Sequence, residues 1–73
     1  MTIQEAWQAT WEDAVAAATD DAVVRWRMIV LLRAGYLWED AFELAAATDV
    51  DLHLAVELAS RGCASHVARR ILL

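Results

Sequence analysis

The 73 residues contain no proline, and only two glycines, Gly35 and Gly62, are available to break a helix. Good helix formers such as alanine and leucine fill much of the rest, and 60% of the residues are hydrophobic. A chain with so few helix breakers is expected to be helical over most of its length. No segment alternates between apolar and polar residues for long enough to indicate a strand. The sequence therefore predicts an all-α fold, a small bundle of four to five short helices.

The apolar pattern divides the chain into two regions. Residues 1–21 are expected to form an amphipathic N-terminal helix that begins at Thr2, where Glu5 completes a capping box. Residues 22–73 are expected to form the bundle, with helices over 22–34, over 37–47, from Asp49 or Asp51 to Arg61, and over 65–72. Because the second helix is apolar on nearly all sides, it is expected to be central and buried.

A short pattern occurs twice. Leu31-Leu32-Arg33-Ala34-Gly35-Tyr36 aligns with Leu58-Ala59-Ser60-Arg61-Gly62-Cys63. We call the alignment that matches Leu31 with Leu58, and Gly35 with Gly62, the repeat register. Each copy reads as a helix end, a glycine cap, an apolar residue and the start of another helix. Two interpretations stay open, an internal repeat or two ordinary glycine-capped turns, since repeat architectures need at least three units.

The tryptophans and the apolar C-terminus are the candidates for a contact surface. Trp7 and Trp11 are one turn apart in the first helix, and they belong either to the core or to an exposed binding stripe, because aromatic residues are enriched at interface hot spots. Trp26 and Trp38 fall in the second helix and at the start of the third, where a core role is expected. The aliphatic ending must be buried in this chain or in another. The residues expected to contact a partner protein are Trp7, Trp11, Val15, Tyr36, Leu72 and Leu73.

Charge is segregated along the chain, whose net charge is −5. Residues 1–21 and 35–59 carry acids and no base, whereas residues 22–34 and 60–73 carry arginines and no acid. Such segments can neutralise one another when helices pack, although exposed pairs contribute only about 0–1 kcal/mol each. A second hypothesis is that an acidic face mimics DNA and inhibits a nucleic-acid-binding protein. The carboxylates of that face would be Glu39, Asp40, Glu43, Asp49 and Asp51. Direct binding of DNA or RNA is not expected, because acids would face the phosphates.

Gly35-Tyr36 reads as a loop after a helix, Thr48-Asp49 as a polar turn, and Ala55-Val56-Glu57 as part of the following helix. In this order and spacing, the stretch from Ala34 to Leu58 resembles the ubiquitin-associated (UBA) domain. The resemblance implies a compact three-helix core over about residues 23–60 and a role in protein recognition.

Two positions depart from the UBA pattern. Ala34 stands where the family has methionine, and Ala59-Ser60 stands where it has Leu-Leu. These departures argue against ubiquitin as the partner. The remaining expectation is an adaptor or assembly subunit that binds another protein or a second copy of itself. An Ala- and Arg-rich chain without lysine is typical of a GC-rich bacterium or its phage.

No group of residues indicates catalysis. The chain has two histidines, and Cys63-x-x-His66 supplies only half of a four-ligand zinc site. His53 would lie about 15 Å from Cys63 along a helix, so the two cannot share one ion. We therefore expect no enzymatic activity, no metal and no cofactor. The longest strongly apolar run, Met28 to Leu32, is too short to span a bilayer, and the acidic N-terminus lacks a secretory signal. These features predict a cytoplasmic protein without a membrane partner.

Overall fold

The computed structural model describes residues 12–73. Residues 12–18 form a helical segment. Four helices follow: α2 (Ala22–Arg33), α3 (Trp38–Ala46), α4 (Leu52–Ser60) and α5 (Ser65–Leu72). Residues 12–73 contain no strand. The prediction of a small all-α bundle with four to five helices is confirmed, whereas the expected start of the first helix at Thr2 lies outside the described residues.

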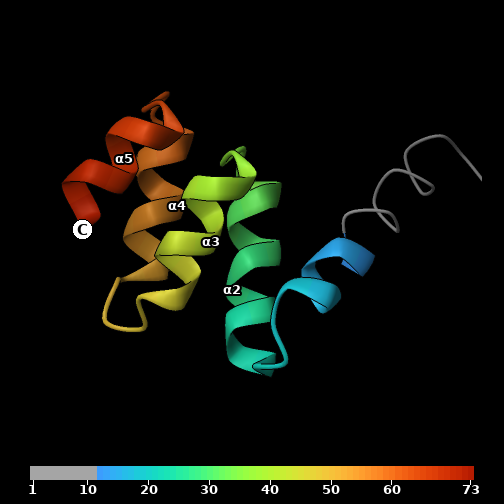
Figure 1. Cartoon of the computed structure of the whole chain (residues 1–73). Helices are drawn as coiled ribbons and strands as arrows, with labels where there is room; N and C mark the ends of the chain where they lie inside the picture. The colour runs from blue at the N-terminus through green and yellow to red at the C-terminus, as the bar shows by residue number, and fades with distance from the viewer. Residues whose placement is uncertain (1–11) are drawn as a thin grey trace, which may run out of the picture.

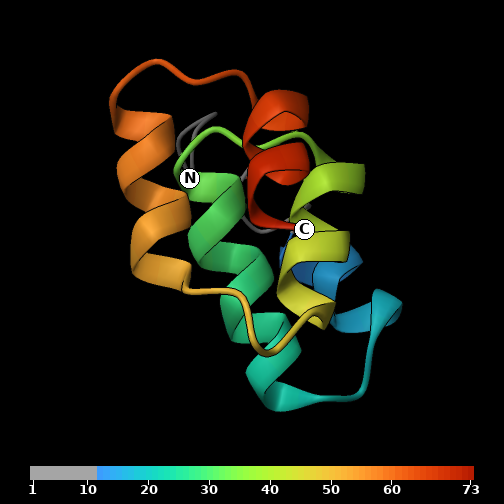
Figure 2. The same cartoon turned by 90° about the vertical axis from the view of Figure 1, so that its left-hand side faces the viewer.

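The four labelled helices pack in a ring. Helix α2 contacts α3 and α4, and α5 contacts the same two helices. Figure 1 shows α4 and α5 on one side of the bundle and residues 12–18, in blue, on the opposite side of α2. The α2–α3 and α4–α5 turns lie at the same end in both Figure 1 and Figure 2. The core consists of Val15, Val24, Met28, Leu31, Tyr36, Ala41, Leu44, Ala45, Val50, Ala55 and Ala68.

Two of the helices begin at an aspartate because its side chain accepts hydrogen bonds from the first backbone N–H groups. Asp21 accepts from the amides of Val23 and Val24, at 2.9 and 3.2 Å, and so starts α2. Asp51 starts α4 in the same way and accepts from His53 at 2.9 Å. Of the two N-caps considered for this helix, Asp51 is the one used.

The glycine-capped turns have the same hydrogen bonds. In the first, the amide of Tyr36 donates to the carbonyl of Leu31 at 3.1 Å, as the amide of Cys63 donates to Leu58 at 3.1 Å in the second. The glycines adopt φ angles of 106° and 85°, which residues with a Cβ rarely adopt. This is the Schellman arrangement, and it occurs twice in the repeat register. Both interpretations of the repeated pattern predict this arrangement, so both stay open. We call each helix–glycine–helix segment a unit, the first formed by α2 and α3 and the second by α4 and α5.

Helix α2 buries different residues from those expected. Trp26 is 58% exposed, whereas Arg27 next to it is only 8% exposed. The expectation of a core position is therefore wrong for Trp26, and it is also wrong for Trp38, which is 38% exposed. The guanidinium of Arg27 crosses to the C-terminal end of α3 and donates to the carbonyls of Leu44, Ala45, Ala47 and Val50. No basic residue lies in the last turn of α3, so Arg27 supplies the positive charge that a helix C-terminus favours.

Candidate functional site

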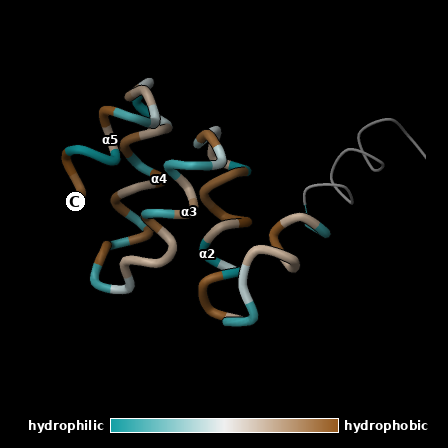
Figure 3. Tube along the Cα trace, in the orientation of Figure 1, coloured by the Kyte–Doolittle hydropathy of each residue, from teal (hydrophilic) through white to brown (hydrophobic). Residues whose placement is uncertain are grey.

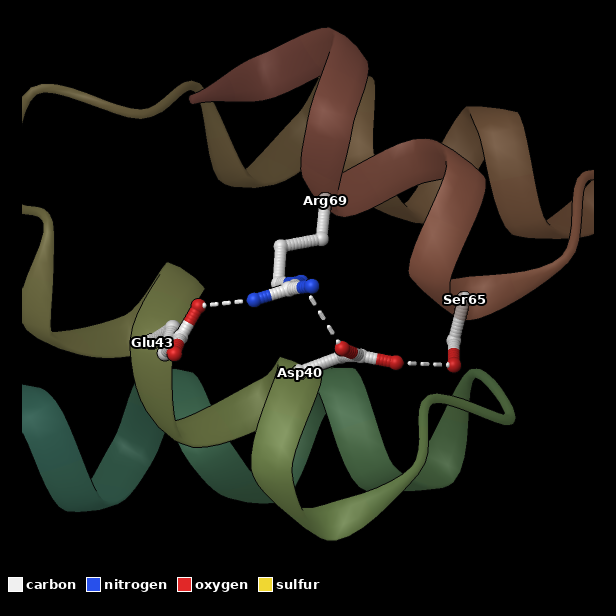
Figure 4. A network of polar contacts seen from close by, with 4 residues as sticks. All are labelled: Asp40, Glu43, Ser65 and Arg69. Carbon is white, nitrogen blue, oxygen red and sulfur yellow. Dashed lines mark hydrogen bonds and ion pairs between the residues drawn. The ribbon is translucent and has the colours of Figure 1, made fainter.

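A polar network joins α3 to α5 (Figure 4). Ser65 donates its hydroxyl to an Asp40 carboxylate oxygen at 2.5 Å, and Arg69 donates from Nη1 to Glu43 at 2.6 Å. Arg69 Nε also lies 3.0 Å from the other oxygen of Asp40, but it is not aligned for a hydrogen bond, so that contact is electrostatic. The bond to Glu43, together with nearby carboxylates, raises the pKa of Arg69 above its ordinary value.

Asp40 has a structural role at the start of α5. The N-cap residue of α5, Ala64, has no side chain that could bond the first amides of the helix. Asp40 is buried and accepts from Ser65, the first residue of α5, so its negative charge lies at the positive end of that helix. Asp40 therefore binds α5 to α3 in two ways, through the hydroxyl of Ser65 and through Arg69.

The acids of the proposed DNA-mimic face have different surroundings. Asp40 and Glu43 contact Arg69, and Asp51 caps α4. Glu39 and Asp49 are exposed. The structure thus uses three of the five carboxylates in contacts within the chain.

The outer side of α5 carries an exposed apolar surface. Val67 and Ile71, one helical turn apart, are 41% and 62% exposed, and Leu73 is 61% exposed. Arg70 is exposed between them, and an open hollow of about 280 Å³ is lined by Arg69, Arg70 and Leu73. Figure 3 shows strongly hydrophobic residues in the last turn of α5, at the C-terminus. We call the four residues Val67, Arg70, Ile71 and Leu73 the tail face.

The repeat relates the tail face to a covered surface of α3. In the repeat register, Asp40 corresponds to Val67 and Glu43 to Arg70. In the first unit these positions contact α5, whereas in the second unit they are exposed. In the first unit, the side of α3 that carries Asp40 and Glu43 is therefore in contact with α5. In the second unit, the corresponding side of α5, which carries Val67 and Arg70, is open.

The six residues predicted to contact a partner are not brought together on one surface. Trp7 and Trp11 lie outside the described residues. Val15 and Tyr36 are core side chains, and the Tyr36 hydroxyl donates to the carbonyl of Ala55 at 2.6 Å. Burial, with added effects of Cys63 and Asp40, raises the pKa of Tyr36. Leu72 is half-buried and Leu73 is 61% exposed, so within residues 12–73 Leu73 is the predicted contact residue that lies at the surface.

Val67 and Arg70 were not expected from the sequence, whereas Ile71 belongs to the aliphatic ending that was expected to be buried in this chain or in another. Elsewhere in the chain, Trp11-Glu12-Asp13-Ala14 recurs as Trp38-Glu39-Asp40-Ala41, with the same spacing as the repeat register. The corresponding residues of α5, Ser65-His66-Val67-Ala68, share only the alanine with this pattern, so the recurrence does not extend to the tail face. Burial of the side chains does not follow this sequence pattern in residues 12–18, where Ala14 is exposed and Val15 is buried.

A half-open pocket of about 180 Å³ lies between the two turns. Small residues from both turns line it, among them Gly35, Gly62 and the half-buried Cys63. Within residues 12–73, no three His, Cys, Asp or Glu side chains are grouped so that they could hold a metal ion. In the same part of the chain, no helix has the length and apolar character needed to cross a membrane.

Comparisons of this chain with protein-family models, with curated proteins and with solved structures found no match.

Proposed function

We propose that this chain is a non-enzymatic protein-interaction module, an adaptor or an assembly subunit, that binds a protein partner through the tail face. One observation carries the proposal. Val67 and Ile71 are exposed on α5, whereas the corresponding side of α3 is covered by α5. Burial of a large aliphatic side chain is worth about 1.5–3 kcal/mol, so covering these residues would favour association. The UBA resemblance supports the same class of function.

The chemistry of the tail face also limits the partner. Arg69 and Arg70 are the arginines of α5, which has no acid. A partner is therefore expected to present apolar side chains beside carboxylates or aromatic rings, the groups to which arginine binds well. An acidic inhibitor is less well supported, because Asp40 and Glu43 are neutralised by Arg69 and could not both face a basic groove.

Site-specific photo-crosslinking tests the proposal. A photoreactive amino acid replaces Ile71 on the tail face or, as a matched control, Val23, an aliphatic residue with similar exposure on α2. We expect discrete cross-linked protein adducts from position 71 and none of the same adducts from position 23. Identical adducts from both positions, or no adduct from position 71, would contradict binding through the tail face.

A further inference from the structure

We infer that the tail face binds an amphipathic helix of a partner protein, and that this helix presents carboxylates one turn apart beside aliphatic side chains. The inference rests on the proposed function and names the chemistry of the partner. It starts from the way in which α5 already binds an acidic helix within the chain, through the side that carries Ala68, Arg69 and Leu72, which we call the inner side.

The inner side shows what an arginine of α5 binds. Ala68 is buried and Leu72 is half-buried, and Arg69 accompanies them. The guanidinium of Arg69 lies 2.6 Å from Glu43 and 3.0 Å from Asp40, two carboxylates of α3 that are three residues apart (Figure 4). Residues at this spacing are neighbours on the surface of a helix. An arginine that lies beside apolar residues on α5 therefore already binds an acidic pair on a neighbouring helix.

The tail face has the same combination of side chains and is exposed. Arg70 lies with Val67 and Ile71 at the i, i+3 and i+4 spacing of one helix side. Arg70 forms no ion pair within residues 12–73. The open hollow of about 280 Å³ is lined by Arg69, Arg70 and Leu73. A carboxylate that entered the hollow would therefore lie beside two arginines.

The form of the tail face fits a helix better than a strand. The backbone groups of α5 bond to one another within the helix, so they offer no free edge to which an extended peptide could pair. Val67 and Ile71 form a ridge of the i, i+4 kind, which the groove of another helix receives. Helix α5 already packs against two helices, α3 and α4. Its eight residues extend over about 12 Å, so two to three turns of a partner helix can cover them.

The charges of α5 determine the sign of the partner. Helix α5 contains Arg69 and Arg70 and no acid, so an acidic helix meets no carboxylate of α5 itself. The chain as a whole has a net charge of −5 and repels acidic proteins at long range. A preference for an acidic helix must therefore come from the contact itself, where Arg70 is exposed. Reversing the charge of Arg70 is consequently a sharper test than changing the ionic strength, which screens the attraction and the repulsion together.

The segment of α3 that α5 binds supplies the sequence pattern expected of the partner. Asp40 and Glu43 are each followed by a buried aliphatic residue, Ala41 and Leu44. In this order, the carboxylates pair with arginine while the next residues contribute to an apolar surface. We expect the partner helix to carry the same pattern, acid–aliphatic–x–acid–aliphatic.

Two synthetic helical peptides with a fluorophore test the inference on the full chain. The acidic probe repeats the pattern over about three turns, with glutamate as the acid and leucine as the aliphatic residue. The basic probe has lysine in place of each glutamate. Fluorescence anisotropy measures both affinities, and we expect the unmodified chain to bind the acidic probe at least about tenfold more tightly than the basic probe.

Variants of the tail face separate the effects of charge and of apolar contact. Arg70→Glu should reverse the preference, so that the basic probe binds more tightly. Arg61→Glu is the matched control, because Arg61 is an exposed arginine in the turn before α5 and its reversal changes the net charge by the same amount. This control should keep the preference for the acidic probe. Ile71→Gln, which is polar but uncharged, should weaken the binding of both probes about tenfold.

The contrary results are equally definite. Equal affinities of the two probes for the unmodified chain, or a preference that survives Arg70→Glu, would overturn the inference. The same holds if neither probe binds at concentrations up to about 1 mM. Far-UV circular dichroism checks that each variant is folded. Arg70→Gln, which should abolish the preference, and Ile71→Ala replace any variant that is not.

Photo-crosslinking at position 71 keeps this inference separate from the proposed function. Adducts in which the cross-linked segment of the partner is not an acidic helix would overturn the inference and leave the proposed function standing. An adduct between two copies of this chain would do the same, since a second copy would then cover the tail face. If no adduct forms although probe binding depends on Arg70, the proposed function alone is contradicted.

Discussion

The Nη2 atom of Arg27 lies 2.7 Å from the carbonyl oxygen of Val50, which is 23 residues away in the chain. Through this bond and those to Leu44, Ala45 and Ala47, one side chain of α2 satisfies carbonyls at the end of α3 and in the turn before α4. Arg27 thereby positions three successive helices.

Replacing Arg27 by methionine should destabilise the fold strongly. The substitution keeps the apolar stem but removes the guanidinium donor from the carbonyls of Leu44, Ala45 and Val50, whereas Ala47 keeps a bond from the Val50 amide. Each buried group that is left unsatisfied costs about 1–3 kcal/mol. We expect the melting temperature to fall by about 4–8 °C for each kcal/mol lost. The matched control is Arg33→Met, since Arg33 is exposed and its one ion pair within residues 12–73 is with Glu12, at 3.3 Å. Thermal unfolding followed by circular dichroism measures both, and equal losses would contradict the role of Arg27.

Tyr36 should make stability depend on pH in alkaline solution. Burial raises the pKa of its phenol, so above pH about 10 the unfolded chain loses this proton before the folded chain does. The contribution of Tyr36 is therefore fully present below that pH and falls as the pH rises through the raised pKa. Tyr36 is the single tyrosine of the chain, so the ultraviolet absorbance of the phenolate reports its titration alone.

The variant Tyr36→Phe should flatten this pH dependence. It should also lower the free energy of unfolding at neutral pH by about 0.5–1.5 kcal/mol, because the hydrogen bond to the Ala55 carbonyl is lost. Urea unfolding at a series of pH values on both sides of the ordinary tyrosine pKa measures both effects. Parallel decline in the variant and in the unmodified chain would show that other groups cause the pH dependence.

Asp40→Asn should loosen α5. The amide keeps the shape of the side chain but removes the charge that faces Arg69 and the start of α5, and a hydrogen bond to a charged group contributes about 1.5–3 kcal/mol. Amide hydrogen exchange should accelerate more in α5 than in α2. Glu39→Gln, a change of the same kind at an exposed neighbour, should leave the exchange unchanged. A uniform increase over all helices would contradict a local role for Asp40.

Gly35→Ala and Gly62→Ala should each destabilise the protein by about 1–2 kcal/mol, since both glycines have positive φ angles. A Cβ at either position would meet no atom within 4 Å, so the cost comes from the backbone and not from a clash. Denaturant unfolding measures the loss. A loss confined to one variant would contradict the equivalence of the two turns.

The local elements could be predicted from the sequence because their causes are local. Aspartates start α2 and α4, and glycines with positive φ angles end them, within one or two residues of the expected bounds. The burial of Arg27 could not be predicted, because the carbonyls that it binds are 17 to 23 residues away. Nothing in the local sequence distinguishes Arg27 from Arg25 and Arg33, which remain near the surface.

The candidate surface was only partly predictable for a related reason. An apolar C-terminus was recognised, and Leu73 is indeed exposed. Tyr36 looked like a contact residue because aromatic side chains are frequent at interfaces, but its hydroxyl reaches the backbone of α4 and the ring is buried. The importance of Val67 and Ile71 depends on the counterpart side of α3 being covered, which only the packing of the two units reveals.

The two units of this chain meet through unlike sides, Asp40 and Glu43 on one and Ser65 and Arg69 on the other. An interface of this kind does not close on itself, so each unit keeps one side that the contact leaves unused. Because Val67 and Arg70 stand where Asp40 and Glu43 do, a duplicated second unit would meet the existing one through different types of residue, so a longer protein would need new contacts to evolve at the added junction.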